Sequence, residues 1–425
     1  MKFIPFKRFV QSRKGGAWGQ DAGKDEVDVS CVRVADFEYD KLTSKKILST
    51  IRSIPARQYK NIKLNKGDIL IEKSGGGETT LVGRAISFDQ EIDTICSNFI
   101  ERIEIKTNKL EPKFACYILA SAYSNKINAS CIKQTTGIQN LDVDAYLSSV
   151  LVPDIPKEKQ RRIVDFLESK IKDISDSIFK KRVCLQKLSE YRQSLITQAV
   201  TKGLDPNVEM KDSDKPMLKS YPKHWQISKI SRVCTVQTGK TPSGLSEKSF
   251  TEDKNSVHWV TPGDFSDDGI YRGCARRLSE EAEKEVPVYS AHSVLFVGIG
   301  ASIGKVMYSA VPVSSNQQIN GISCGSKLLP QFLMYFLTAR CEITRETAPQ
   351  STLPILNQTK TGEIYIPIPP MSEQKAIVGY VDSILNKLYN TDKRIAETLV
   401  KLYEYRSSLI TAAVTGKIDI SEVNQ

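Results

Sequence analysis

The chain contains a tandem duplication, and this feature limits its fold more than any other. The segment VPDIPKEKQRRIVDFLESK...LQKLSEYRQSLITQAVTKGLD begins at Val152 and returns as IPIPPMSEQKAIVGYVDSI...LVKLYEYRSSLITAAVTGKID from Ile366. The offset of 214 residues (366 minus 152) then holds without a gap to Asp205 and Asp419. Such self-similarity predicts a chain built from two related halves.

Each copy is predicted to form one long helix. Pro156 and Pro370 stand where a helix begins and a missing N–H costs nothing, and no proline or glycine interrupts residues 157 to 200. Apolar residues recur in steps of three and four, about 3.5 on average, which is typical of a coiled-coil seam. The seam residues are Ile163, Leu167, Ile171, Ile174, Ile178, Leu185, Leu188, Leu195 and Ala199, and then Ile377, Val381, Leu385, Leu388, Ile395, Leu399, Leu402, Leu409 and Ala413.

Four charged residues, Lys181, Arg192, Asp392 and Arg406, fall on this seam. Such residues weaken packing but can fix the register between two helices. A helix of ~44 residues is ~66 Å long at a rise of 1.5 Å per residue, too long for one small domain to bury. We therefore expect each helix to pack against the other copy.

The segments ahead of the helices are predicted to be mixed α/β domains, which makes the fold class α+β. Short β-rich runs such as GDILIEK (67–73) and SVLFVGIG (293–300) alternate with glycine-rich turns, and the polar, proline-bearing stretch 201–225 reads as a connector. The duplication extends weakly into these domains, where VRVADF from Val32 resembles VTPGDF from Val260. The predicted boundaries are 1–152 for the first domain, 153–204 for the first helical spacer, 205–366 for the second domain with a linker at 205–225, and 367–425 for the second spacer.

Bulk properties narrow the function classes. Lys and Arg outnumber Asp and Glu by 60 to 49, and a net charge of +11 favours a polyanionic partner. The nine cysteines are scattered without a CxxC pair, which argues against a disulfide framework or a zinc site and fits a reducing cytoplasm. The start MKFIPFKRFV lacks the apolar stretch of a signal peptide, and no run of eighteen apolar residues occurs. We expect neither secretion nor a membrane span.

Motifs that resemble catalytic signatures each miss an essential group. The run GIGASIGKV from Gly298 leaves three residues between its later glycines where a phosphate loop needs four, and Val306 replaces the magnesium-binding hydroxyl. In IPIPPM, Ile368 cannot accept the hydrogen bond that an amino-methyltransferase requires. Asp154 and Glu168 match the letters of a magnesium nuclease motif, yet Glu168 lies inside the predicted helix, and the three histidines lack metal-ligand spacing. We therefore predict no catalytic residue and no metal site.

The doubled motif resembles a known family. Two variable domains, each followed by a helix with P-x-E/S-x-Q-x-x-IV at its start and L-x-x-YRxSLITxAVT at its end, are similar to the specificity subunit of type I restriction-modification systems. Further matches are YPKHW, TGKTP, HWVTPGDF and SSNQQING in the second half, and SGGGET, VGRA and TGIQNLDVDAYL in the first. The resemblance covers the whole chain. The first half departs from it in starting at IPFKRF without a proline–tryptophan pair.

The resemblance implies a non-catalytic subunit that binds double-stranded DNA sequence-specifically. Its two target-recognition domains would each read one half of a bipartite target, joined by helices that pair as an antiparallel coiled coil with pseudo-two-fold symmetry. Two methyltransferase subunits and two restriction (motor–nuclease) subunits would be its partners, performing adenine methylation and restriction. S-adenosylmethionine, ATP and Mg would be bound by those partners, so this chain would need no cofactor and no membrane.

Two alternatives from other classes remain open. One is a coiled-coil scaffold whose domains bind peptides or glycans, and the other is a self-contained nuclease. The basic balance and the glycine-rich loops with Lys and Arg favour DNA binding over both.

Candidate DNA-reading residues are polar side chains in glycine-rich loops, where the backbone approaches phosphate and side chains reach base edges. In the first half these are Lys73, Ser74, Arg84, Lys133, Gln139 and Asn140, and in the second Lys240, Thr241, Thr261, Lys305, Asn316, Gln317 and Asn320. Candidate partner-binding residues recur in both helices although none lies on the seam: Glu190, Tyr191 and Ser194, and then Glu404, Tyr405 and Ser408. A partner bound twice, or packing against the neighbouring domain, would explain this recurrence.

Overall fold

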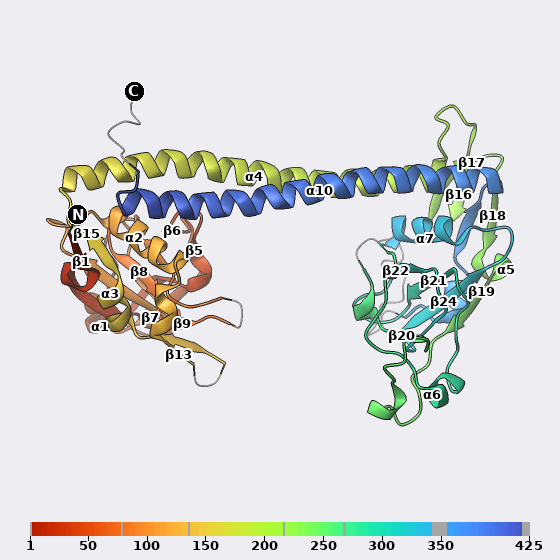
Figure 1. Cartoon of the computed structure of the whole chain (residues 1–425), viewed down its shortest axis with the longest axis horizontal. Coiled ribbons are helices and arrows are strands. Elements are labelled where there is room, and N and C mark those ends of the chain that lie inside the picture. The colour runs from red at the N-terminus through yellow and green to blue at the C-terminus, as the bar shows by residue number, and fades with distance from the viewer. Residues whose placement is uncertain are drawn as a thin grey trace. The chain divides into compact units, whose positions relative to one another are not determined.

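The computed structural model describes residues 2–77, 80–134, 137–215, 217–266, 269–341 and 355–418. The chain divides into two compact units, unit 1 with Met1–Val183 and Ile395–Gln425, and unit 2 with Cys184–Arg394. Each unit contains one α/β domain, the first part of one long helix and the last part of the other (Figure 1). The two units therefore have the same internal plan, as a duplicated sequence predicts.

The domain of unit 1 is built around a six-stranded sheet in the order β2-β12-β8-β10-β6-β5. The run GDILIEK forms its central strand because Ile69, Leu70 and Ile71 are all fully buried. The strands of this sheet are β2 (Val10–Gly15), β5 (Phe37–Glu38), β6 (Thr43–Ser44), β8 (Ile69–Glu72), β10 (Ala85–Ser87) and β12 (Ile100–Ile105). The smaller sheets are β11-β4-β7-β3 (Thr94–Cys96, Val27–Val32, Ile51–Ile54, Gln20–Asp21), β13-β14-β9 (Ile132–Gln134, Gln139–Leu141, Ser74–Gly75) and β1-β15 (Phe3–Pro5, Leu151–Pro153). The helices are α1 (Ala56–Ile62), α2 (Pro112–Ser124), α3 (Val143–Ser149) and the 3-10 turns Phe6–Phe9, Val34–Asp36 and Ile127–Cys131.

The domain of unit 2 has a four-stranded sheet in the order β19-β24-β21-β22. These strands are β19 (Cys234–Thr238), β24 (Ile319–Cys324), β21 (Ser293–Val297) and β22 (Val306–Ser309), and the paired strands are β16 (Met210–Lys215) with β17 (Leu218–Pro222), β18 (Gln226–Lys229) with β25 (Tyr365–Ile368), and β20 (His258–Val260) with β23 (Val313–Ser315). The helices are α5 (Ile230–Val233), α6 (Glu280–Lys284), α7 (Pro330–Ala339), α9 (Gln358–Gly362) and the 3-10 turns Glu247–Ser249 and Pro262–Asp264. Part of the predicted linker is ordered strand here, because Leu218, Tyr221 and Trp225 are buried in the core of the unit. The strand pair β1-β15 of the first domain corresponds to β18-β25, so the first half begins in the same way without a proline–tryptophan pair.

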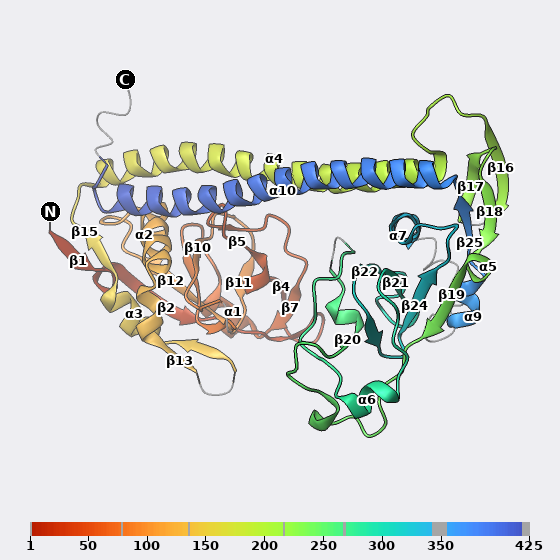
Figure 2. The same cartoon turned by 45° about the vertical axis from the view of Figure 1, so that its right-hand side comes forward.

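The long helices are α4 (Lys157–Lys202) and α10 (Met371–Val414). Within each unit they run side by side in opposite directions (Figures 1 and 2), and every predicted seam residue is buried or half-buried. The predicted α+β fold, with two mixed α/β domains and paired long helices, is confirmed. No helix in the described part of the chain is both long and apolar enough to span a bilayer.

The glutamine of the repeated motif anchors the start of each long helix. The buried Gln160 side chain accepts a hydrogen bond from the N–H of Glu111 at 2.9 Å, and Gln374 accepts one from Leu329 at 2.7 Å. Each amide also donates to two backbone carbonyls nearby. Because Glu111 and Leu329 cap α2 and α7, these glutamines lock each helix to its own domain.

The charged seam residues are paired differently in the two units. In unit 2, Arg192 of α4 forms an ion pair with Asp392 of α10. The residue that corresponds to Asp392 in the first copy is Ile178, so Arg406 of unit 1 has no equivalent acid across the seam. Arg406 instead binds Asp40 of the first domain at 2.6 Å. The pseudo-equivalence of the two helix pairs therefore breaks at this position.

Candidate nucleic-acid interface

The two domains share a backbone frame although their side chains differ. The Gly16 N–H donates to the Ile100 carbonyl at 3.0 Å, and the Gly239 N–H donates to Ile319 at 2.9 Å. A Cβ at either glycine would lie 2.1 to 2.2 Å from a neighbouring carbonyl oxygen, so only glycine permits this approach. Other backbone hydrogen bonds recur in both domains and identify further equivalent positions. The equivalent pairs are Ala17 and Lys240, Arg33 and Thr261, Asp36 and Asp264, Lys73 and Gly298, Ser97 and Asn316, and Phe99 and Gln318.

Three of the predicted first-domain residues form a row across adjacent strands. Ser74 on β9 is the register partner of Asn140 on β14, and Asn140 is the register partner of Lys133 on β13. The Ser74 hydroxyl donates to the Asn140 side-chain oxygen at 2.7 Å, and the exposed Lys133 ammonium lies 3.9 Å from Asp142. Lys73, next to Ser74, is half-buried. This row is accessible and carries both hydrogen-bonding and cationic groups.

Two predicted amide side chains are used inside their own domains. Gln139 is buried, accepts the Val82 N–H at 3.1 Å and donates to the Gly77 carbonyl at 2.9 Å. Asn320 is buried in the second domain and donates to the Leu356 carbonyl at 2.9 Å. It also binds the hydroxyls of two threonines. Both amides position a loop, which sequence reasoning could not distinguish from an exposed reading role.

The Arg84 side chain lies with the long helices. It stacks on Tyr39 at 4.5 Å and on Tyr123 at 5.4 Å, and its Nε donates to the Tyr123 hydroxyl at 3.1 Å. These residues line a cavity of about 700 Å³ together with Tyr403 and Arg406 of α10. Burial raises the pKa of the adjacent Glu72 to about 7, and Arg84 only partly opposes this rise.

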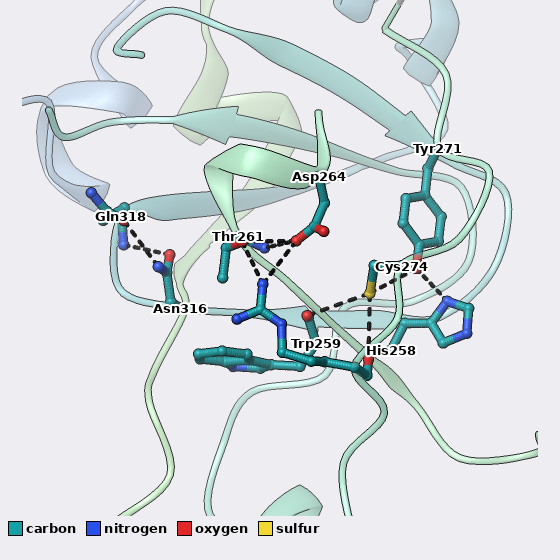
Figure 3. Close-up of polar contacts among 9 residues, drawn as sticks. His258, Trp259, Thr261, Asp264, Tyr271, Cys274, Asn316 and Gln318 are labelled. Atoms are coloured by element: carbon teal, nitrogen blue, oxygen red, sulfur yellow. Dashed lines mark hydrogen bonds and ion pairs between the residues drawn. The ribbon is translucent and has the colours of Figure 1, made fainter. Parts of the chain in front are cut away.

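In the second domain, four predicted residues come together on two loops. The exposed Lys240 and its neighbour Thr241 follow β19, and Asn316 and Gln317 follow β23. The Thr241 hydroxyl donates to the Gln317 side-chain oxygen at 2.6 Å. The Asn316 amide donates to the Gln318 side-chain oxygen at 3.0 Å, as Figure 3 shows. Lys305 is exposed in the turn before β22.

Thr261 lies at the start of a 3-10 turn that ends at Asp264. The Thr261 N–H and hydroxyl both donate to one Asp264 oxygen, at 2.7 and 2.8 Å (Figure 3). Arg276 completes this cluster, since its Nη2 donates to the Thr261 hydroxyl at 2.7 Å and lies 3.3 Å from Asp264. Its guanidinium lies over the ring of the buried Trp259, 5.1 Å from the centroid.

Sequence reasoning missed Arg276 and Gln318. The three-residue spacing of Thr and Asp in TPGDF is typical of a capping box and could have indicated the turn. No local signal indicates Arg276, because it lies on a separate segment of the chain. Its backbone carbonyl accepts the Trp259 N–H at 3.0 Å.

Behind this cluster, β20 is held by a small polar network. The Tyr271 hydroxyl contacts His258 Nδ1 and lies 3.4 Å from the Cys274 sulfur (Figure 3). Burial lowers the pKa of His258 and raises the pKa of the Cys274 thiol, so both groups are neutral near pH 7. Among the described residues, no cluster of three His, Cys, Asp or Glu could hold a metal ion.

The candidate partner-binding residues are exposed in both copies. Tyr191 and Tyr405 are each more than half exposed, and their neighbours Glu190, Ser194, Glu404 and Ser408 are exposed as well. Glu190 and Ser194 also line a cavity of about 1440 Å³ in unit 2. The structure therefore leaves both copies of this motif accessible.

Comparisons with known proteins agree on one family. The model of the type I restriction modification DNA specificity domain matches residues 10–181 and 222–401. The MjaIX specificity subunit of Methanocaldococcus jannaschii is 26% identical over 206 residues, 46% of each chain, and the MjaVIII specificity subunit of the same organism is 24% identical over 386 residues, covering 86% of this chain and 82% of its own. A solved structure described as "Structural basis underlying complex assembly and conformational transition of the type I R-M system" aligns over 97% of both chains with a TM-score of 0.73 and 16% identity, a likeness of fold.

Proposed function

The chain belongs to the type I restriction-modification DNA specificity family, and from this membership we propose that it reads a bipartite double-stranded DNA target, one half-site per domain. The observation that carries the proposal is the pair of equivalent backbone frames with different side chains. At matched positions the first domain has Ala17 and Ser97, whereas the second has Lys240 and Asn316. Equivalent frames present the two surfaces alike, and different side chains select different bases.

The chemistry of these surfaces suits DNA. Asn and Gln can bind adenine edges through paired hydrogen bonds, and Lys can bind guanine edges or phosphate. Asn316, Gln317 and Lys240 supply these groups in the second domain, and Asn140 and Lys133 supply them in the first. The net charge of +11 adds attraction to the phosphate backbone that does not depend on sequence.

Members of this family are specificity subunits, which are not themselves catalytic, and we propose partners for the chemistry. Two methyltransferase subunits would dock on the repeated surfaces around Tyr191 and Tyr405, and two restriction subunits would join them for cleavage. S-adenosylmethionine, ATP and Mg would be bound by these partners in the cytoplasm, and this chain would bind no cofactor. The support is that an exposed motif recurs at two equivalent helix positions, as a partner bound twice requires.

The test is to co-express the chain with its methyltransferase subunit and to sequence the methylome of the host. We expect N6-methyladenine in one split motif, absent from cells that express the methyltransferase alone. Replacing residues 1–152 with the same half of a relative should change one half-site and leave the other unchanged. A change in both half-sites would refute independent reading, and a complex that neither binds nor methylates DNA would favour the scaffold alternative.

A further inference from the structure

Each domain holds one arginine against the aspartate of its own copy of the equivalent 3-10 turn. In the first domain, Arg33 Nε and Nη2 lie 3.1 and 3.3 Å from the two Asp36 oxygens. In the second, Arg276 Nη2 lies 3.3 Å from Asp264 and 2.7 Å from the Thr261 hydroxyl. The aspartates are equivalent, because each accepts the backbone N–H of the residue three positions before it.

The two arginines reach this common position from different places in the sequence. Arg33 is the residue that begins its turn, whereas Arg276 follows Asp264 by twelve residues and lies on a segment beside β20. The counterpart of Arg33 in the second domain is Thr261, which carries no charge. The two domains, whose sequences have diverged, therefore each place an arginine on the equivalent aspartate, although the two arginines come from different positions in the sequence.

Neutralising a buried carboxylate does not explain both arginines. Asp36 is buried, but the Lys45 ammonium already lies 3.8 Å from it. The Asp264 side chain is 22% exposed and keeps access to water. An ion pair so close to solvent contributes little to stability. A role outside the domain is the better explanation for the second cation.

Both arginine side chains are partly accessible and held in place. The Arg33 side chain is 38% exposed and that of Arg276 is 41% exposed. Within the described residues, Nη1 of Arg33 and both Nε and Nη1 of Arg276 have no hydrogen-bond partner, so each fork keeps donors for a ligand. The Arg276 guanidinium lies over the Trp259 ring, and the indole N–H of Trp259 donates to the Lys240 carbonyl at 3.3 Å.

The paired aspartate favours a base edge over a phosphate as the ligand. Asp264 offsets the charge of Arg276, so this pair is nearly neutral, and Asp36 lies as close to Arg33, with Lys45 as a second cation beside it. A carboxylate so close to the arginine would repel a phosphate. The directional N–H donors remain, and an arginine fork on guanine O6 and N7 is the commonest specific contact in the major groove. A clamped fork also loses little conformational freedom when it binds.

We propose that Arg33 and Arg276 each read the guanine of one G·C pair in the half-site of their own domain. This inference rests on the proposed function and adds to it the residue and the base. It predicts that each half-site contains a required G·C pair, and that the requirement at this pair depends on the arginine of one domain alone.

The test compares R276A and R276K in the complex with the methyltransferase subunit. R276K keeps the charge but loses the planar fork. We expect both variants to relax the methylated motif at one G·C pair of the second-domain half-site, while the first half-site stays unchanged. The preference for the intact over the substituted duplex should fall roughly 10- to 100-fold in a binding titration. R33A should do the same at one pair of the other half-site. The matched control is K284A, because Lys284 is an exposed α6 residue paired with Glu280.

Two results would overturn the inference. One is an unchanged motif at full activity in R276A. The other is equal weakening on all sequences by R276A together with normal behaviour of R276K, which would identify a phosphate contact. If circular dichroism shows that R276A does not fold, R276K decides the question alone. The proposed function fails separately, when the wild-type complex itself shows no sequence-specific methylation.

Discussion

Replacing Asp392 with alanine should loosen the helix pair of unit 2, whereas replacing Asp392 and Arg192 together with apolar residues should restore it. The two side chains form an ion pair on the part of the seam within unit 2, where the other seam residues are apolar. In the first copy, the position of Asp392 is occupied by Ile178, which is buried. An R192L/D392I double variant therefore gives this seam an apolar pair of similar size.

The magnitude follows from partial burial. The Arg192 and Asp392 side chains are 34% and 30% exposed. The ion pair should therefore contribute a free energy between that of an exposed pair, under ~1 kcal/mol, and that of a buried pair, whose breaking costs ~3–5 kcal/mol. Arg192 Nε and Asp392 Oδ1 are buried without a partner among the described residues, which keeps the value toward the lower end. We expect D392A to lower the local free energy of opening by about 1–2 kcal/mol. The double variant should equal or exceed the wild type, because apolar replacement of such pairs is often neutral or stabilising.

Hydrogen exchange of the whole protein is the appropriate assay, because a chain of two units does not unfold in one two-state step. Peptides from 184–202 and 371–394 should exchange roughly 5- to 30-fold faster in D392A. Protection should return in R192L/D392I. If R192L/D392I loses as much protection as the single variants R192L and D392I combined, the residues are not coupled and the reasoning is wrong.

A matched variant in unit 1 serves as the control. I178D places a carboxylate at the buried counterpart of Asp392, but Arg406 is already engaged by Asp40 at 2.6 Å. The new carboxylate would be buried without a free partner, so we expect a loss of more than ~2 kcal/mol in unit 1. Protection of 184–202 should not change.

Three further predictions concern other parts of the chain. Q374L removes the three hydrogen bonds of the buried Gln374 side chain at the start of α10 and should cost about 2–4 kcal/mol in local opening measured by hydrogen exchange. Q160L should do the same in unit 1, and a loss under about 1 kcal/mol would contradict the anchoring role. Burial raises the pKa of Glu72 to about 7 from an ordinary 4.5, so the folded state disfavours the ionised carboxylate and loses stability as pH rises through this window. E72Q should therefore raise the melting temperature more at pH 8 than at pH 5, with a gain in folding free energy of up to about 3 kcal/mol at pH 8. Equal gains at the two pH values would contradict the shift in pKa. Combining Tyr191→Ala with Tyr405→Ala should abolish the complex with the methyltransferase subunit at micromolar concentration without lowering thermal stability, and an intact complex in size-exclusion chromatography would contradict the docking proposal.

The duplication, the two long helices and their seam could be predicted from the sequence alone. These signals are local, since heptad spacing and a repeated motif can be found along the chain without knowing what each residue contacts. The sequence also indicated the exposed motif at Tyr191 and Tyr405, because residues that recur off the seam stand out against the heptad pattern. The mixed α/β character of the domains followed from short β-rich runs between glycine turns.

Only the tertiary structure decided which side chains meet. Gln139 and Asn320 carry amide groups that can bind base edges, but both side chains are buried and hold loops. Arg84 lies in a cavity beside α10. Arg276 joins Thr261 from a segment with no recognisable motif, because strand β20 pairs with it through the backbone. Such meetings depend on the register and order of strands that are distant in sequence, and these are determined by packing of the whole domain rather than by any local pattern.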